Sequence, residues 1–227
     1  MSKADQLLDA IEIETGENPS SSVIWMHGLG ADGNDFVPIV SELGLDGAPA
    51  TRFLFPHAPM RPVTMNNGYV MRAWYDVSLG DLEGNSRRAD ERGVRESQKS
   101  ITALIEREVK RGVEPEHIVL AGFSQGGAIA LQTGLRYPRK LAGVMALSTY
   151  LPLAESLPRE AAAANRNTPI FMAHGTYDPV VPLVMGAGSM TLLTGLGYAV
   201  EWRQYPMPHS VCPEEIQDIG VWLRTVL

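Results

Sequence analysis

The sequence is poor in cysteine and in positive charge. Its 227 residues include a single cysteine, Cys212, which excludes an internal disulfide and any metal site built from clustered cysteines. Lysine and arginine number 19 against 26 aspartates and glutamates, so the formal net charge is -7. This balance argues against a nucleic acid or an anionic membrane as a partner held by bulk electrostatics. One cysteine also fits a reducing compartment, and we expect a cytoplasmic protein.

The sequence also lacks a long uninterrupted hydrophobic segment. Its amino-terminal stretch carries Asp5 and Asp9 and has no apolar core of the kind found in signal peptides. Residues 179–200 contain no charged residue and are long enough to span a bilayer, but prolines, glycines and hydroxyl residues interrupt them. We therefore expect a loop there, followed by a short helix at about 183–196.

The rest of the chain alternates short apolar runs with helical segments, and its length is most simply one domain, 1–227. An edge strand is expected within 7–14, and a helix at about 35–43. Further strands are expected at 23–26, 52–55, 118–121, 141–148, 170–173 and 200–205, and helices at 93–112, 128–135 and 213–227. This alternation predicts an α/β domain with a mainly parallel, doubly wound sheet.

Three connecting segments have distinctive composition. Residues 56–68 are rich in proline and asparagine and are expected to be irregular. Residues 76–90 form a polar excursion that, in a compact domain, is more often a functional loop than a neglected one. The glycine-rich segment 27–34 follows the apolar run 23–26, and ligands bind at the carboxyl ends of such strands.

The most informative motif is a serine between paired glycines. The apolar run 118–121 leads directly into Gly122-Phe123-Ser124-Gln125-Gly126, and a segment of helical composition follows. This is the context of a nucleophile elbow, where glycines two positions away leave room for a serine on a sharp, strained turn. A helix cap or a phosphate loop would also use serine and glycine, but the lysine of a phosphate loop is absent.

A nucleophilic serine needs a base and an acid that orients it. The order serine, acid, histidine, usual for this architecture, leaves His174 and His209 as candidate bases. His209 lies in a loop after the last expected strand, whereas His174 ends a strand and is expected to be structural. Asp178 follows that strand and is the best-placed acid. We therefore predict a catalytic triad of Ser124, Asp178 and His209.

Attack by a serine on an ester carbonyl creates an oxyanion, which two backbone N–H groups would stabilise. The residue after the nucleophile, Gln125, would supply one amide, and Leu29 would supply the other. Gly28 and Gly30 allow the Leu29 backbone to turn inward. A nucleotide-binding loop is disfavoured because the Gly-x-Gly-x-x-Gly spacing is missing and Asp32 would repel phosphate.

Five motifs in order along nearly the whole chain carry a resemblance to a known family: His27-Gly28-Leu29-Gly30-Ala31-Asp32, Arg72-Ala73-Trp74-Tyr75-Asp76, Gly122-Phe123-Ser124-Gln125-Gly126-Gly127, His174-Gly175 with Asp178-Pro179-Val180-Val181-Pro182, and Met207 with His209-Ser210-Val211-Cys212. The sequence resembles the small carboxylesterases related to acyl-protein thioesterases and lysophospholipases. The resemblance implies an α/β-hydrolase fold without a large lid domain, no cofactor and no metal. It also carries the family's triad over to Ser124, Asp178 and His209, and its oxyanion donors to Leu29 and Gln125.

The same resemblance implies the substrates. These are carboxylic esters with short to medium acyl chains, with thioesters, lysophospholipids and acylated proteins as further candidates. The wall of the acyl pocket is expected to include Trp74, Val77, Tyr150, Leu151 and Val180. Thr149 departs from the small residue that is usual in such proteins, and is expected to narrow this pocket. An acyltransferase with the same triad, or a non-catalytic ligand-binding protein with this fold, remains an alternative.

The uncharged helix expected at 183–196 leads to one more prediction. A surface helix without charge on any face is unusual in a monomer, so its larger apolar side chains are candidates for a subunit contact in a homodimer. These side chains are Met185, Met190, Leu192 and Leu193. Cys212 is expected to be a small core residue, with a reactive thiol as the alternative.

Overall fold

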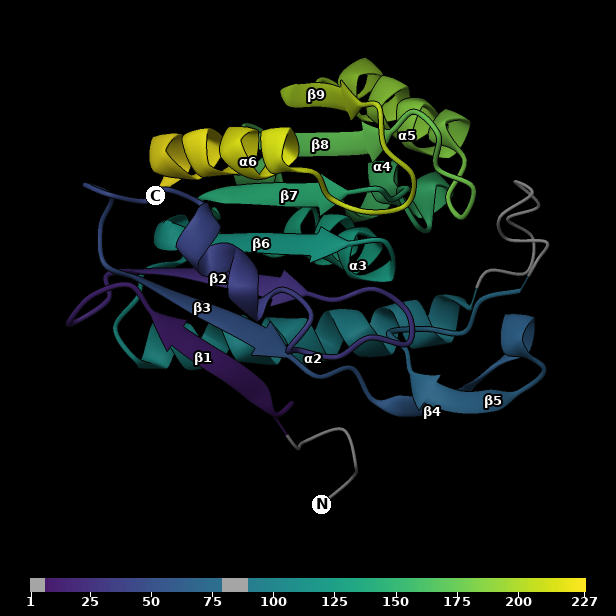
Figure 1. Ribbon diagram of the computed structural model, residues 1–227, viewed down its shortest axis with the longest axis horizontal. Coiled ribbons are helices and arrows are strands. Elements are labelled where there is room, and N and C mark those ends of the chain that lie inside the picture. The colour runs from purple at the N-terminus through teal and green to yellow at the C-terminus, as the bar shows by residue number, and fades with distance from the viewer. Residues whose placement is uncertain (1–6, 79–89) are drawn as a thin grey trace.

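The computed structural model describes residues 7–78 and 90–227, and its centre is a seven-stranded sheet in the order β1-β3-β2-β6-β7-β8-β9 (Figure 1). The strand at one edge, β1, pairs antiparallel with β3, and the other neighbouring pairs are parallel. The mainly parallel sheet predicted from the sequence is therefore confirmed. Its strands are β1 (Ala10–Glu14), β2 (Ser21–Met26), β3 (Thr51–Pro56), β6 (Ile118–Phe123), β7 (Gly143–Leu147), β8 (Ile170–Gly175) and β9 (Val200–Tyr205).

Helices cover both faces of this sheet. Behind it in Figure 1 lie α2 (Glu91–Lys110) and α3 (Gln125–Gly134), and in front lie α6 (Pro213–Val226) and the 3-10 helix η2 (Val37–Glu42). The helix α5 (Leu183–Gly195) packs mainly against β8 and β9. Short helical turns complete the described chain: η3 (Thr64–Asn66), η5 (Pro115–His117), η6 (Ala154–Ser156), α4 (Leu157–Glu160) and η7 (Ala163–Asn165).

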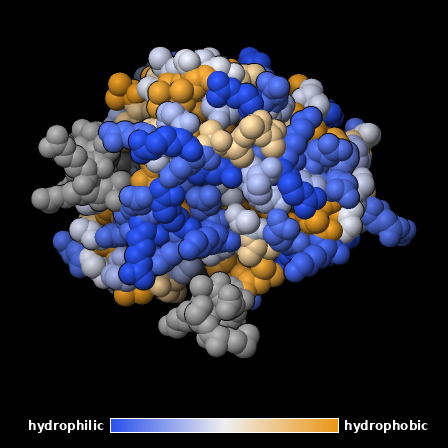
Figure 2. Space-filling model, turned by 180° about the vertical axis from the view of Figure 1, so that it is seen from behind, coloured by the Kyte–Doolittle hydropathy of each residue, from blue (hydrophilic) through white to orange (hydrophobic). Residues whose placement is uncertain are grey.

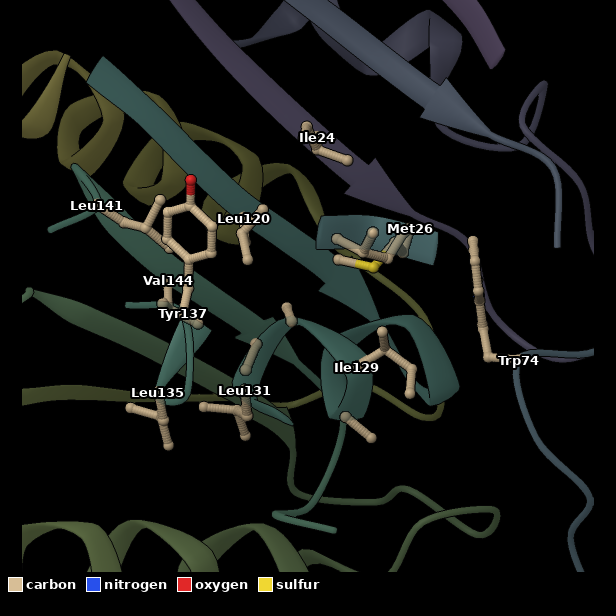
Figure 3. Close-up of a cluster of buried hydrophobic side chains, with 14 of the residues drawn as sticks. Ile24, Met26, Trp74, Leu120, Ile129, Leu131, Leu135, Tyr137, Leu141 and Val144 are labelled. Carbon is tan, nitrogen blue, oxygen red and sulfur yellow. The ribbon is translucent and has the colours of Figure 1, made fainter. Parts of the chain in front are cut away.

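Two hydrophobic cores lie on the two faces. Successive side chains of a strand point to opposite faces, so Ile24 and Met26 join the core under α2 and α3, while Val23 and Trp25 join the core under α6 and η2. Figure 3 shows part of the first core, in which strand side chains face Ile129 of α3. The central strands β6 and β7 are buried on both faces, as expected for parallel strands between two helical layers.

The long helix α2 shows how local sequence and packing agree. The side chain of Asp90 caps its amino end by accepting a hydrogen bond from the Gly93 amide (2.8 Å), and Arg107 and Lys110 lie in its last turn. Val94, Ile101, Leu104 and Ile105 are buried on one face. The side of the molecule on which α2 lies has a surface that is largely hydrophilic (Figure 2). The predicted helix is confirmed, and begins two residues earlier because of the Asp90 cap.

Two predicted segments differ from the structure. Residues 56–68 were expected to be irregular, but β4 (Met60–Val63) pairs antiparallel with β5 (Tyr69–Arg72) in a hairpin. Proline is tolerated in this two-stranded ribbon because each strand has an unpaired edge, and Asn67 and Gly68 make the turn with φ of 55° and 76°. The helix expected at 35–43 is the tighter η2. The predicted functional loop at 76–90 lies mostly outside the described residues.

Candidate active site

Ser124 lies on the sharp turn between β6 and α3, with φ of 53°. A positive φ is uncommon and strained for a residue with a β-carbon. Hydrogen bonds hold the turn: the Ser124 amide donates to the Leu147 carbonyl (2.9 Å), and the Thr149 hydroxyl donates to the Ser124 carbonyl (2.7 Å). The strained backbone and its fixed partners give the turn the geometry of a nucleophile elbow.

Close packing explains the glycines beside Ser124. A β-carbon on Gly122 would lie 2.2 Å from the carbonyl carbon of Gly126, and one on Gly126 would lie 2.2 Å from the Met26 carbonyl oxygen. Both distances are too short for any side chain. The glycines therefore let the first turn of α3 approach β6 and β2, and this approach forces the sharp turn at Ser124.

His209 and Asp178 meet above the carboxyl ends of the strands. The Nδ1 atom of His209 lies 2.7 Å from Oδ2 of Asp178, and the other carboxylate oxygen accepts hydrogen bonds from the amides of Val180 (2.8 Å) and Val181 (2.9 Å). The carboxylate thus favours the tautomer with a proton on Nδ1, which leaves Nε2 free to accept a proton. The His209 ring packs against the ring of Phe123, the residue that precedes Ser124, with centroids 4.7 Å apart.

His174 also lies near Asp178, with its Nε2 3.6 Å from Oδ2, but its other surroundings differ from those of His209. It is buried, and its Nε2 lies 2.8 Å from the Val181 carbonyl oxygen. Burial lowers the pKa of its imidazole, which favours the neutral form. A β-carbon on Gly186 of α5 would lie 2.4 Å from its Nδ1, so the helix closes over the ring. These contacts agree with a structural role for His174.

The loop that contains Leu29 is held by its neighbours on both sides. The Gly30 amide donates to the Arg72 carbonyl (2.9 Å), and the Trp74 indole donates to the His27 carbonyl (2.9 Å). Nδ1 of His27 lies 2.7 Å from the Gly28 carbonyl oxygen, and its Nε2 accepts from the backbone at Ala58 (3.1 Å). Burial lowers the pKa of His27 to about 4, so the imidazole holds these contacts in its neutral form.

The side chain of Gln125 connects the elbow to the segment after β5. Its Oε1 accepts a hydrogen bond from the Trp74 amide (3.0 Å), and its Nε2 donates to the Tyr75 carbonyl (2.8 Å). Residues 72–75 therefore hold both predicted oxyanion donors, Leu29 through its loop and Gln125 through its side chain. This role of residues 72–75 was not predictable from the sequence, although the Arg72–Asp76 motif indicated the segment.

Two separate cavities lie near these residues, and Ser124 is in the lining of neither. The larger, which we call the α5 cavity, has a volume of about 590 Å³ and is lined by Tyr75, Tyr150 and Leu151 together with side chains of α5. The smaller, which we call the His209 cavity, has a volume of about 410 Å³ and is lined by His209 and Phe123 together with residues of η2 and the start of α6. The two cavities share no lining residue.

The predicted pocket residues fall into two groups. Tyr150 and Leu151 line the α5 cavity. Tyr75 and the α5 residues Met185 and Leu192, which the sequence does not indicate as pocket residues, line it too. The hydroxyl of Tyr150 lies 3.0 Å from that of Tyr75. The other group lines neither cavity: Trp74 and Val77 are buried in the core (Figure 3 shows Trp74), Val180 is exposed, and Thr149 is buried behind Ser124.

The described residues also bear on metal binding and membrane insertion. Within 7–78 and 90–227, no group of three or more histidine, cysteine, aspartate or glutamate side chains is arranged to hold a metal ion. No helix in the same ranges has the length and apolar character needed to cross a bilayer.

Comparison with known proteins finds relatives along nearly the whole chain. Residues 8–227 match the sequence family described as Phospholipase/Carboxylesterase. Acyl-protein thioesterase 1 of Cryptococcus neoformans is 39% identical over 97% of this chain and 98% of its own. Acyl-protein thioesterase 1 of Gibberella zeae is 40% identical over 92% and 91% of the two chains. The crystal structure of Arabidopsis thaliana SOBER1 superposes with a TM-score of 0.81 at 34% identity, covering 90% of this chain and 98% of that one.

Proposed function

We propose a reaction mechanism for this chain, which belongs to the phospholipase/carboxylesterase family because its residues 8–227 match that family. It has the α/β-hydrolase fold and is a hydrolase, and its relatives support the hydrolysis of esters or thioesters. We infer that Ser124 is the nucleophile, His209 the base and Asp178 the acid that orients the base. The observations that carry this proposal are the 2.7 Å contact between His209 and Asp178 and the packing of the His209 ring on Phe123, the residue before the strained Ser124.

In the first half of the reaction, Ser124 attacks the carbonyl carbon of the substrate while Nε2 of His209 accepts its hydroxyl proton. Asp178 stabilises the imidazolium that forms. The carbonyl oxygen becomes an oxyanion, which accepts hydrogen bonds from the amides of Leu29 and Gln125. Each such donor contributes about 3 to 4 kcal/mol of transition-state stabilisation. His209 then gives its proton to the leaving alcohol or thiol, and the acyl group stays on Ser124.

In the second half, water takes the place of the leaving group. His209 accepts a proton from the water as its oxygen attacks the acyl-enzyme, and the same two amides stabilise the second oxyanion. Collapse of this intermediate returns the proton to Ser124 and releases the carboxylic acid. The cycle needs side chains, backbone amides and water, and the roles of the three side chains can be tested by substitution.

The α5 cavity is the proposed site for the acyl group. Its volume of about 590 Å³ lies within the range of pockets that bind small molecules. Leu151, Met185 and Leu192 supply apolar wall, while charged side chains such as Arg95 and Glu160 belong to the same lining. An apolar acyl chain would release water from the apolar wall, which favours binding.

The substitution Ser124→Ala tests the nucleophile. We expect the kcat for a short p-nitrophenyl ester to fall by about 10⁴-fold or more, since the remaining groups cannot form an acyl-enzyme. Labelling by a fluorophosphonate probe should be lost with it. The far-ultraviolet circular dichroism spectrum of the variant should match that of the wild type, which separates loss of chemistry from loss of fold. Retained hydrolysis by the folded variant would rule out Ser124 as the nucleophile.

A further inference from the structure

We propose that the His209 cavity binds the leaving-group half of the substrate and selects an alcohol or thiol that carries an organic cation. This inference rests on the proposed roles of Ser124 and His209. It concerns a cavity of which the proposed hydrolysis uses only His209.

The position of the cavity indicates which half of the substrate it takes. The two halves of an ester extend in different directions from the carbonyl carbon, and only the leaving alcohol or thiol receives a proton from the base. His209 and Phe123 both line this cavity, and Phe123 directly precedes Ser124. The α5 cavity shares none of its residues and is the separate place for the acyl half. The group beside His209 is therefore the leaving group.

The inner surface of the cavity is apolar and partly aromatic. The rings of Phe36 and Phe123 lie 5.7 Å apart and both contribute to the lining. Ile39, Val211 and Ile216 complete this apolar surface. Apolar and aromatic walls suit the methyl or methylene groups around an ammonium ion, and aromatic faces attract the positive charge itself.

The rim supplies negative charge without a compensating cation. Asp35 and Glu42 belong to the lining, and the lining contains no lysine or arginine. Among the described residues, neither carboxylate forms an ion pair within 4 Å. The α5 cavity differs, because Arg95 and Arg159 lie among its acidic residues.

The size of the expected preference follows from the exposure of the two carboxylates. Both side chains are exposed, so solvent weakens their attraction for a cation. We expect each carboxylate to raise kcat/KM for a cationic substrate by about two- to fivefold at low ionic strength. The combined preference is then about tenfold, and it should decrease in 0.5 M NaCl because salt screens exposed charges.

A matched pair of substrates tests the inference. Butyrylthiocholine and 3,3-dimethylbutyl thiobutyrate have the same acyl group and nearly the same shape, and differ in the charge of the leaving thiol. The cationic thiol is the more acidic leaving group, so each kcat/KM is divided by the rate constant for hydroxide-catalysed hydrolysis of the same thioester. We expect the wild type to favour the thiocholine ester by about tenfold in this corrected ratio. In the double variant Asp35→Asn, Glu42→Gln the corrected ratio should fall to about one. The control pair Glu17→Gln, Asp46→Asn changes the net charge equally at exposed residues outside both cavities, and should keep the wild-type ratio.

Three outcomes of this substrate comparison would overturn the inference. A wild-type ratio near one, a ratio unchanged in the Asp35, Glu42 variant, or an equal decrease in the control variant would show that the cavity does not select a cation. The proposed hydrolase would still stand in these cases, because the neutral thioester is hydrolysed. Failure to hydrolyse either thioester would overturn the proposed function and this inference together.

Discussion

The side chain of Gln125 shows how one residue can serve the proposed site twice. Its backbone amide is a predicted oxyanion donor, while its side chain holds the Trp74 amide and the Tyr75 carbonyl group. Residues 72–75 also hold the loop of Leu29. An oxyanion hole needs donors in a fixed position before the charge develops. The Gln125 side chain therefore couples the positions of the two donors.

Replacement of Gln125 by methionine tests this coupling, because the shape is similar and the backbone amide remains. We expect kcat to fall by about tenfold with little change in KM, since the oxyanion forms only in the transition state. The free energy of unfolding should fall by about 1 to 3 kcal/mol because two buried backbone groups lose their partners. Steady-state kinetics and urea denaturation measure the two effects. The exposed Gln204 gives a control as Gln204→Met, and a loss of stability without a loss of kcat would contradict the coupling.

At the scale of elements, α6 begins directly after the loop that carries His209, and its first turn contains an unusual carboxyl group. Glu215 is fully buried, and its burial raises the pKa of the carboxyl to about 8. The backbone amide of Cys212 opposes this shift, and the negative charge of Asp218 adds to it. Glu215 is therefore mostly neutral in the folded protein at pH 7, although it sits at a helix end where a negative charge is usually favourable.

This pKa predicts a pH dependence of stability. A carboxyl with a raised pKa in the folded state contributes stability below its unfolded value near 4.5, and this contribution is lost as the pH rises through about 8. We expect Glu215→Gln to flatten the decrease in the free energy of unfolding between pH 5 and pH 8, by about 3 to 4 kcal/mol. Urea denaturation across this pH range measures it. Glu214 is exposed and adjacent, so Glu214→Gln should leave the wild-type slope, and an equal slope in both variants would contradict the role of Glu215.

Over the whole molecule, the elements with strong periodicity were predictable from the sequence. The apolar run that forms β6 and the amphipathic face of α2 need only local sequence to be recognised. The β4–β5 hairpin was missed because Pro62 indicates a break, and only the pairing of two edge strands makes it tolerable. The motifs led to Ser124, but the side-chain bonds of Gln125 join residues about 50 positions apart, which no local pattern reveals.

The cavities were the least predictable part of the site, because they depend on which side chains tertiary packing leaves open. Trp74 was expected at the pocket wall, yet its indole is buried and donates to the His27 carbonyl. Tyr75, its neighbour, lines the α5 cavity instead. Neighbours in a segment without regular structure follow no fixed alternation, so the sequence could identify the segment but not the residue. A cytoplasmic location, a single domain and the acyl preference stay predictions.

The homodimer also stays a prediction, and the structure sharpens the test of it. Of the four apolar residues expected at a subunit contact, Leu193 is fully buried and Met190 packs on the core, while Leu192 is 39% exposed. Val184, on the same uncharged helix, is 74% exposed. We expect sedimentation at micromolar concentration to give about twice the 24.7 kDa mass of one chain. A contact through α5 would bury Val184, so Val184→Asp should give a monomer, because a dimer would then desolvate an unpaired charge.

The matched control for this experiment is Thr191→Asp, which adds the same charge at an exposed polar position of the same helix. The effect of Val184→Asp on the mass should exceed that of Thr191→Asp if apolar contact through Val184 holds the subunits together. A monomeric wild type at micromolar concentration would contradict the dimer. A dimer that survives Val184→Asp would place the contact elsewhere on the molecule. In that case the exposed apolar residues of α5 would serve only as part of the wall of the α5 cavity, where Val184 and Leu192 both lie.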